Sequence, residues 1–149
     1  MELPGTVGML LHHKSSQVWS ISPEATVFDA IQSMADKNIG ALLVLEDGLL
    51  IGVLSERDYT RKVILKGRSS KATAVREIMT KQLFTVSLDD SIEDCMRIVT
   101  QRRVRHLPVL ESGLVVGMVS IGDLVKWTIE AQAMTIDQLE KYIVGEYPA

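Results

Sequence analysis

The sequence is poor in the residues that support redox, membrane and base-stacking chemistry. Among its 149 residues are one cysteine and seven aromatic residues, and no apolar run approaches the roughly 18 residues of a membrane span. Cys95 cannot form an internal disulfide, and its place between Ile92 and Met96 at apolar helical spacing predicts a buried, unreactive thiol. The start, residues 1–11, lacks the basic region of a secretory signal. We therefore expect a soluble, cytoplasmic protein.

Sequence motifs of the common enzyme classes are also missing. The chain has no Walker P-loop, no G-x-G-x-x-G, no Cys or His pair at metal spacing, and no serine in the context of a nucleophile elbow. The pair His12-His13 has no obvious partner carboxylate for a metal. We predict a binding module with no catalytic residues, no metal and no catalytic cofactor.

Positive charge is concentrated in the middle of the chain. The net charge is −3, yet 12 of the 16 lysines and arginines fall between Arg57 and Arg105. This basic middle is either a solvated helix end and linker or a surface that faces phosphate. No aromatic residues interleave it to stack bases, and the tail is acidic, so nucleic-acid binding is the weaker reading.

An internal duplication organises the sequence. Residues 18–62 (the first copy) align without a gap on residues 83–127 (the second copy) at a shift of 65, with 11 of 45 positions identical. Average residue usage would give roughly 3 identities by chance. Two copies are too few for a solenoid, which needs about 3 units. We expect two half-domains that face each other, with a ligand near the seam.

Each copy predicts the order strand, helix, strand, strand, helix. The alternating stretches 18–21 and 83–86 read as strands, and Thr26 and Ser91 begin capping boxes for the helices that follow. Two apolar runs around a glycine turn, at 41–54 and 107–119, predict hairpins. The fold class is therefore α+β, with two repeats about a pseudo-twofold axis and a C-terminal helix.

We divide the chain into five parts on this basis. These are an N-terminal segment at 1–17, the first repeat motif at 18–64, a linker at 65–82, the second repeat motif at 83–129 and a helical tail at 130–149. The tail should contain its own helix, capped at Thr135. It could cover a face of the module or pair with a second subunit.

The pattern G-h-h-S-x-x-D, where h is apolar, occurs once in each copy, as Gly52–Asp58 and Gly117–Asp123. Ser55 and Ser120 can simply cap a helix. Alternatively, a helix that starts at a strand end presents free backbone N–H groups to an anion, and an aspartate there can accept from two ribose hydroxyls. Both readings stand on spacing alone, and the second predicts a nucleotide site.

These residues resemble CBS motifs, the cystathionine β-synthase repeats that pair into a Bateman module. The likeness covers about 18–64 and 83–129, and it rests on residues 21–31, 103–109, both G-h-h-S-x-x-D segments and the lead-in at 75–80. The chain is similar to the stand-alone CBS-pair proteins of bacteria and plant organelles. The resemblance implies a regulatory homodimer that senses AMP, ADP, ATP, NAD(H) or S-adenosylmethionine and transmits a conformational change to a partner.

The resemblance also implies two ligand sites, each completed by the other copy. The first would use Ser55, Arg57, Asp58, Met79, Thr80, Phe84, Arg105, His106 and Pro108. The second would use Ser20, Ile21, Gly40, Ala41, Leu42, Ser120, Gly122 and Asp123. The first would also gather the neighbouring basic linker, so we predict that it binds phosphate better.

Two alternatives remain at this point. The chain could be a structural or interaction module, for example a regulator of a redox enzyme, whose nucleotide pockets are vestigial. It could also bind RNA or DNA through its basic middle, which predicts a steep salt dependence of affinity. A vestigial pocket would have no need of both Asp58 and Asp123 beside capping serines.

Overall fold

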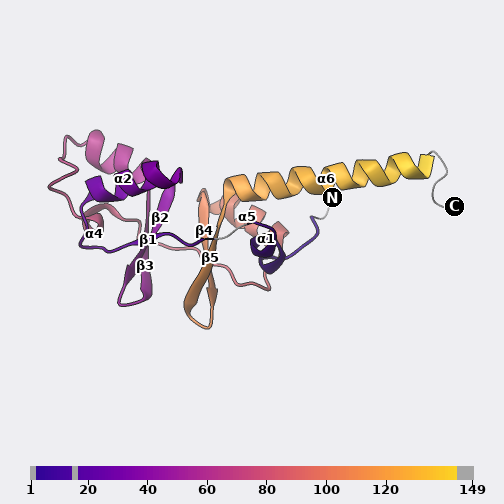
Figure 1. Cartoon of the computed structure of the whole chain (residues 1–149), viewed down its shortest axis with the longest axis horizontal. Coiled ribbons are helices and arrows are strands. Elements are labelled where there is room, and N and C mark those ends of the chain that lie inside the picture. Colours follow the sequence, from indigo (N-terminus) through magenta and orange to yellow (C-terminus); the bar gives the residue numbers. More distant parts are fainter. Residues whose placement is uncertain (1–2, 15–16, 144–149) are drawn as a thin grey trace.

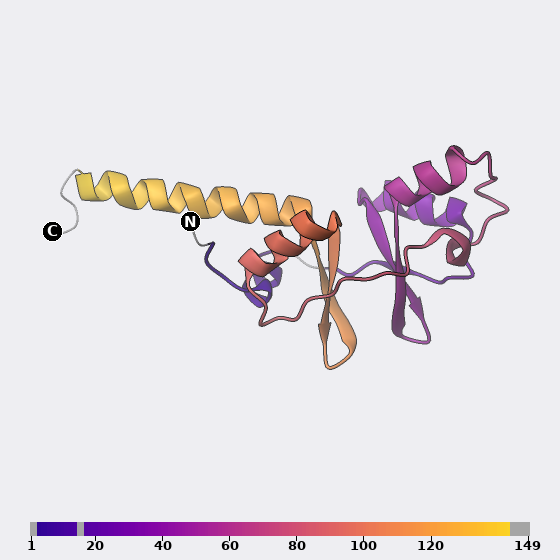
Figure 2. The same cartoon turned by 180° about the vertical axis from the view of Figure 1, so that it is seen from behind.

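A computed structural model of the chain describes residues 3–14 and 17–143, with side chains as far as residue 134. Two lobes lie side by side, with their hairpins pointing in the same direction and most of their helices gathered at the other end (Figure 1). Seen from behind, the last helix leaves the second lobe and extends well beyond it (Figure 2). Among the described residues, no helix is both long and apolar enough to cross a membrane.

The first lobe contains β1 (Ser20–Ile21), α2 (Val27–Lys37), β2 (Ala41–Glu46) and β3 (Leu49–Ser55). The chain then continues through α3 (Glu56–Tyr59) into one π-helical segment, η1 (Thr60–Ile64). β1 pairs in parallel with β2, which pairs antiparallel with β3. One face of the sheet and α2 enclose a core that includes Val27, Met34, Leu42, Val44 and Leu54.

The second lobe repeats this plan with α5 (Ile92–Arg102), β4 (His106–Glu111), β5 (Leu114–Ser120) and α6 (Ile121–Ile143). The repeat extends to backbone detail, because each hairpin has its register irregularity at the same place, Val44/Leu45 and Val109/Leu110. Each also turns through two residues with positive φ, which are Asp47-Gly48 and Ser112-Gly113. This is the two-residue geometry that suits the twist of a hairpin. The predicted α+β fold of two repeats is confirmed.

Helix caps follow the sequence prediction in part. The Thr26 hydroxyl accepts from the Asp29 backbone N–H at 3.1 Å, and the Ser91 hydroxyl accepts from Asp94 at 3.0 Å. A full capping box would also need the carboxylate three residues on to accept from the backbone N–H of the cap residue. At Asp94 the carboxylate instead pairs with Arg97 at 2.7 Å. Both helices therefore start where expected, and each has the hydrogen bond to the cap hydroxyl but not the second bond of the box.

Two predicted elements are wrong. Residues 83–86 form no strand: only Val86 bridges to Val109 in the second sheet, while Thr80 bridges to Val53 in the first. The residues between Thr80 and Val86 connect the two lobes, so they cannot pair along one strand. The tail helix does not begin at Thr135, because α6 runs unbroken from Ile121 and no glycine or proline interrupts it after Gly122.

The segments that lead into the two copies are exchanged between the lobes. Residues at the start of α4 (Val75–Ile78) and just before it bond to the first lobe, with Val75 N–H donating to Ala25 and Val27 N–H donating to Thr73, both at 2.8 Å. Residues around α1 (Val7–His13) make the matching bonds to the second lobe, such as Val7 N–H to Asp90 at 2.8 Å. The N-terminal segment is therefore part of the second core.

Each exchanged segment packs on the glycine of the G-h-h-S-x-x-D motif. A Cβ on Gly52 would lie 2.8 Å from Met79 Sδ, and one on Gly117 would lie 2.7 Å from Leu11 Cδ1. Both distances are shorter than van der Waals contact, so the motif needs glycine here for close approach. The two segments correspond at a shift of 68, and Val7, Leu10 and Leu11 match Val75, Ile78 and Met79.

The prediction for Cys95 is confirmed. Its side chain is fully buried in the second core. Burial, with smaller contributions from Asp90 and Asp94, raises the pKa of the thiol to about 11. The group therefore stays protonated at neutral pH and is a poor nucleophile.

The exchange predicts that α1 stabilises the second lobe. Leu10 is 3% exposed, so Leu10→Ala should lower the free energy of unfolding by about 2–5 kcal/mol in a urea titration, because it leaves a cavity in the core. Met9, its neighbour on the same helix, is 57% exposed, and Met9→Ala should stay within about 0.5 kcal/mol. Equal effects of the two substitutions would contradict the placement of α1.

Candidate functional site

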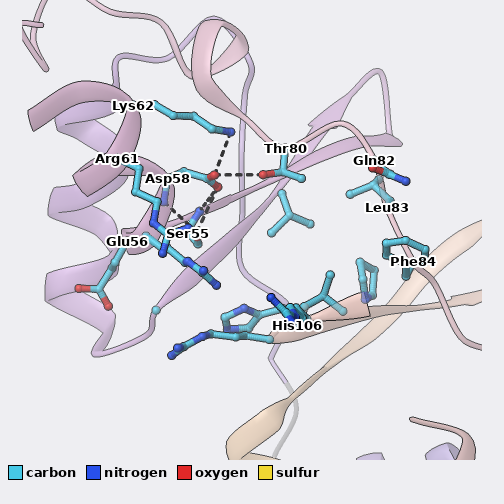
Figure 3. Close-up of a pocket in the computed structure, with 17 residues that line it drawn as sticks. Ser55, Glu56, Asp58, Arg61, Lys62, Thr80, Gln82, Leu83, Phe84 and His106 are labelled. Carbon is cyan, nitrogen blue, oxygen red and sulfur yellow. Dashed lines mark hydrogen bonds and ion pairs between the residues drawn. The ribbon is translucent and has the colours of Figure 1, made fainter. Parts of the chain in front are cut away.

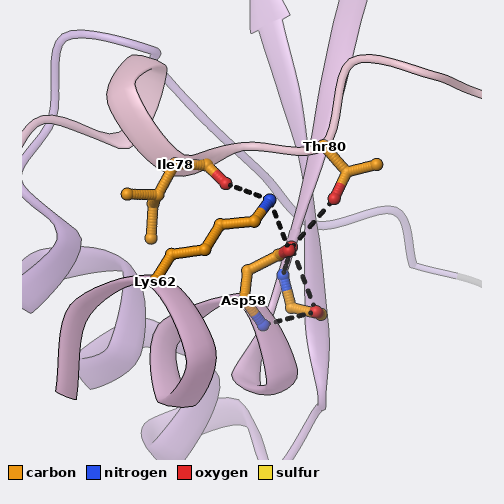
Figure 4. A network of polar contacts seen from close by, with 5 residues as sticks. Asp58, Lys62, Ile78 and Thr80 are labelled. Atoms are coloured by element: carbon orange, nitrogen blue, oxygen red, sulfur yellow. Dashed lines mark hydrogen bonds and ion pairs between the residues drawn. The ribbon is translucent and has the colours of Figure 1, made fainter. Parts of the chain in front are cut away.

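Asp58 lies at the start of α3 and is held by contacts from three parts of the chain (Figure 4). Its Oδ2 accepts from the Ser55 backbone N–H at 3.0 Å and from the Ser55 hydroxyl at 3.1 Å. Its Oδ1 accepts from the Thr80 hydroxyl and from Lys62 Nζ, both at 3.0 Å. Lys62 also donates to the carbonyl of Ile78 at 2.9 Å. The capping box and the ion pair together fix the carboxylate at the strand end.

Asp58 opens onto a cavity of about 540 Å³ between the two copies (Figure 3), named here the Asp58 pocket. The first copy supplies the end of β3 and the start of the following helix, and the second copy supplies the turn from α5 into β4. The crossing stretch between the lobes forms a third wall. The lining residues are Gly40, Val53, Ser55, Glu56, Arg57, Asp58, Arg61, Lys62, Thr80, Gln82, Leu83, Phe84, Arg103, Val104, Arg105, His106 and Pro108.

A second cavity of about 340 Å³, the Asp123 pocket, is related to the first by the duplication. One wall is formed by residues 17–19, which lead from α1 into the first lobe, and another by the turn from α2 into β2. The lining residues are Lys14, Gln17, Val18, Trp19, Asn38, Ile39, Gly40, Ala41, His106, Met118, Ser120 and Asp123. Asp123 Oδ2 accepts from the Ser120 N–H at 2.8 Å and from Lys14 Nζ at 2.6 Å.

The pockets differ in charge. Five cationic and two acidic side chains line the Asp58 pocket, whereas Lys14 and Asp123 balance each other in the Asp123 pocket. The difference arises at two places. At one corner, Arg103, Arg105 and His106 of the second copy replace Asn38, Gly40 and Ala41 of the first, and at the helix start Arg57 and Lys62 stand where the second copy has Gly122 and Trp127. The electrostatic asymmetry expected from the sequence is present in the geometry.

His106 belongs to both pockets, because it starts β4 at the wall between them. Burial lowers the pKa of its imidazole, Asp123 acts in the opposite direction, and Arg105 and Lys14 lower it further. The ring is therefore neutral at pH 7. A neutral imidazole can donate from one nitrogen and accept at the other.

Most of the predicted site residues line the two pockets. Of the first set, Ser55, Arg57, Asp58, Thr80, Phe84, Arg105, His106 and Pro108 lie around the Asp58 pocket. Of the second set, Gly40, Ala41, Ser120 and Asp123 lie around the Asp123 pocket. These twelve residues come from both copies in each case, as the duplication predicted.

Five predicted residues lie elsewhere. Met79 packs on Gly52, and Leu42 is fully buried in the first core, because alternate residues of a strand face opposite sides and Ala41 takes the pocket side. Gly122 lies in the first turn of α6 but does not line the pocket. Ser20 and Ile21 are paired in β1, and the wall is made by the residues just before them.

Sequence reasoning also missed some lining residues. Phe84 was placed correctly in the Asp58 pocket, and a shift of 65 leads from it to Trp19, which lines the Asp123 pocket. The same shift relates Gln82 and Leu83 to Gln17 and Val18. The duplication thus contained the signal. Arg61 and Lys62 lie one helical turn beyond Arg57 and Asp58, on the same side of the helix, and belong to the basic middle. Their spacing from the predicted site residues was the signal that could have identified them.

The basic linker does not join the Asp58 pocket as expected. Arg68 pairs with Glu77 at 2.6 Å, and Arg76 pairs with Glu24 and Glu46. Lys71 lies over the ring of Phe28 at 4.8 Å. These residues have partners away from the pocket, so only residues near the two ends of the basic middle line it.

Comparisons with known proteins identify the family. The chain matches the CBS domain family over residues 13–64 and again over 75–130, and it belongs to that family as a pair of CBS domains. CBS domains generally bind adenosine-containing ligands. It is 41% identical over 137 residues to the mitochondrial CBS domain-containing protein CBSX3 of Arabidopsis thaliana. That match covers 89% of this chain and 66% of the relative, so the chain spans about two thirds of its length.

Solved structures show the same fold. The CBS domain structure NE2398 is 52% identical, with a TM-score of 0.81 over 84% of this chain and 98% of that one. A protein from Burkholderia ambifaria MC40-6, described as a candidate signal-transduction protein with CBS domains, is 46% identical. Its TM-score is 0.83, over 86% of this chain and 96% of that one.

The lowered pKa of His106 predicts a pH dependence of stability. Below the ordinary pKa of 6.5, the unfolded chain binds a proton that the folded chain resists, so the contribution of the neutral ring is present above that pH and is lost as the pH falls. The natural protein should therefore lose more free energy of unfolding between pH 7.5 and 5.5 than His106→Asn does. Denaturant titrations at both pH values check this, and parallel losses would contradict it.

Proposed function

We propose that this pair of CBS domains senses adenine nucleotides, binding them in the clefts between the two copies and passing their occupancy to a partner protein. The observation that carries the proposal is the Asp58 pocket. It places a fixed aspartate at a helix start, with apolar and aromatic surface on one side and several cations on another. A nucleotide presents the same three features, which are ribose hydroxyls, a flat base and phosphate.

The proposed pose follows from the positions of the lining residues. Leu83, Phe84 and Pro108 offer apolar surface for the base. Asp58 faces the ribose. All of its acceptor positions are in use by Ser55, Thr80 and Lys62, so the ribose hydroxyls would replace the latter two at Oδ1. Release of Lys62 would free its ammonium group for the phosphate.

The Asp123 pocket would bind a nucleoside more weakly or with less preference for phosphate. Lys14 already pairs with Asp123 and also donates to the Met118 carbonyl at 2.8 Å, and the corner facing it carries no charge. The Asp123 pocket therefore has no net positive charge to attract a phosphate. The two pockets would then respond to different ligands or to different concentrations of one.

A second function, as an interaction module, is favoured by the surface of α6. The apolar residues Ile121, Val125, Ile129 and Met134 along it are between 42% and 66% exposed, and the helix extends beyond the lobe (Figure 2). Such a surface suits a second copy of the chain or another protein. If the chain acts only as an interaction module, it should not bind nucleotides, and titration with nucleotides distinguishes the two functions.

Calorimetric titration with AMP should show saturable binding that depends on Asp58. Asp58→Asn keeps the side-chain shape but lacks the charge that accepts from two hydroxyls, and we expect its AMP affinity to fall about tenfold or more. Asp123→Asn, the matched change in the other copy, should have a smaller effect. Absence of binding by AMP, ADP and ATP alike to the natural protein would reject nucleotide sensing, and loss caused by Asp123→Asn alone would reject the assignment to the Asp58 pocket.

A further inference from the structure

The arginines of this chain divide into two groups. Four of the eight have partners: Arg68, Arg76 and Arg97 pair with carboxylates, and Arg102 lies 5.3 Å from the centre of the Phe84 ring. The side chains of the other four make no hydrogen bond or ion pair with any part of the chain that the structure describes. All four line the Asp58 pocket, and they are Arg57, Arg61, Arg103 and Arg105.

These four guanidinium groups come from two walls of the pocket, one supplied by each copy. Arg57 and Arg61 are one helical turn apart at the start of the helix that follows β3. Arg103 and Arg105 come from the turn between α5 and β4 of the other copy. The two acids of the lining do not neutralise them, because Asp58 is already paired with Lys62 and only Glu56 remains. Like charges that converge without counter-charges repel each other, and a multivalent anion relieves this repulsion.

The backbone at Arg103 gives an independent indication. Arg103 has φ of +54°, in the left-handed region, where an arginine is uncommon and where Asn is enriched. The equivalent residue of the first copy is Asn38, with φ of +53°. The fold therefore accepts asparagine at this position, and the arginine is held there at a conformational cost although its side chain bonds to nothing in the described protein.

We propose that the Asp58 pocket selects nucleotides by their number of phosphate groups and binds nucleoside di- and triphosphates in preference to AMP. The inference rests on the proposed function and adds the class of ligand. Guanidinium groups bind phosphate through paired hydrogen bonds, and one phosphate cannot satisfy four of them from two walls. Each further phosphate adds about one negative charge near neutral pH, which matches the surplus of cations.

The test is calorimetry with adenosine, AMP, ADP and ATP at fixed ionic strength, with EDTA present so that no metal masks the phosphates. We expect ATP to bind at least about tenfold more tightly than AMP, with ADP between them. The variants Arg103→Asn and Arg105→Gly introduce the residues of the first copy. They should lower ATP affinity about tenfold or more while changing adenosine affinity less than about twofold.

Arg97→Asn is the control for loss of a positive charge, since Arg97 lies on α5 outside the pocket and pairs with Asp94. It should leave ATP binding within about twofold. Equal affinities for AMP and ATP, or equal losses for adenosine and ATP in the two grafted variants, would overturn the inference while the proposed function stands. Absence of binding by all four compounds would overturn the proposed function itself.

Discussion

The exchange of lead-in segments between the two lobes is the constraint on which the rest of the structure depends. Residues 73–79 precede the second copy yet complete the first core, and residues 5–11 precede the first copy yet complete the second core. Both placements require the close contact on Gly52 and Gly117. The chain must therefore cross between the lobes twice. The first core is drawn from the continuous stretch 19–79, whereas the second core is complete only with the N-terminal segment.

The crossings also build the pockets. Residues 80–84 lead from the first lobe to the second along one wall of the Asp58 pocket. Lys14 and residues 17–19 line the Asp123 pocket where the chain leads from the second lobe to the first. Each cleft thus combines a helix start from one copy, a strand corner from the other and a crossing stretch. Because this arrangement is common to both clefts, their different charge comes from side chains alone. Arg103 and Arg105 stand against Asn38 and Gly40 at the corner, and Arg57 and Lys62 stand against Gly122 and Trp127 at the helix start.

Features that depend on a few neighbouring residues were predictable from the sequence. The hairpins, the caps at Ser55 and Ser120 and the burial of Cys95 follow from glycine turns, hydroxyl side chains and apolar spacing, and the structure has all of them. The duplication predicted a ligand site between the copies, and the pairing of each aspartate with the corner of the other copy came from the resemblance to CBS motifs. The difference in charge between the two pockets followed from comparing aligned residues of the two copies.

Features that depend on long-range packing were not predictable in the same way. The equivalence of 73–79 with 5–11 holds at a shift of 68 rather than 65, so the gapless alignment left the N-terminal segment outside the fold. The stretch at 83–86 has the alternation of a strand, but its backbone partners are divided between two lobes. Arg68 and Arg76 look like pocket cations in the sequence, and only tertiary contacts show that Glu24, Glu46 and Glu77 pair with them.

The central claim is that one ligand is held by both copies across the cleft. A titration of the ¹⁵N-labelled chain with ATP, followed through the backbone amide signals, tests it most directly. We expect Asp58 of the first copy, Thr80 and Phe84 of the crossing stretch and His106 of the second copy to shift along one common saturation curve. Shifts confined to one lobe, or separate curves for Asp58 and His106, would contradict the account.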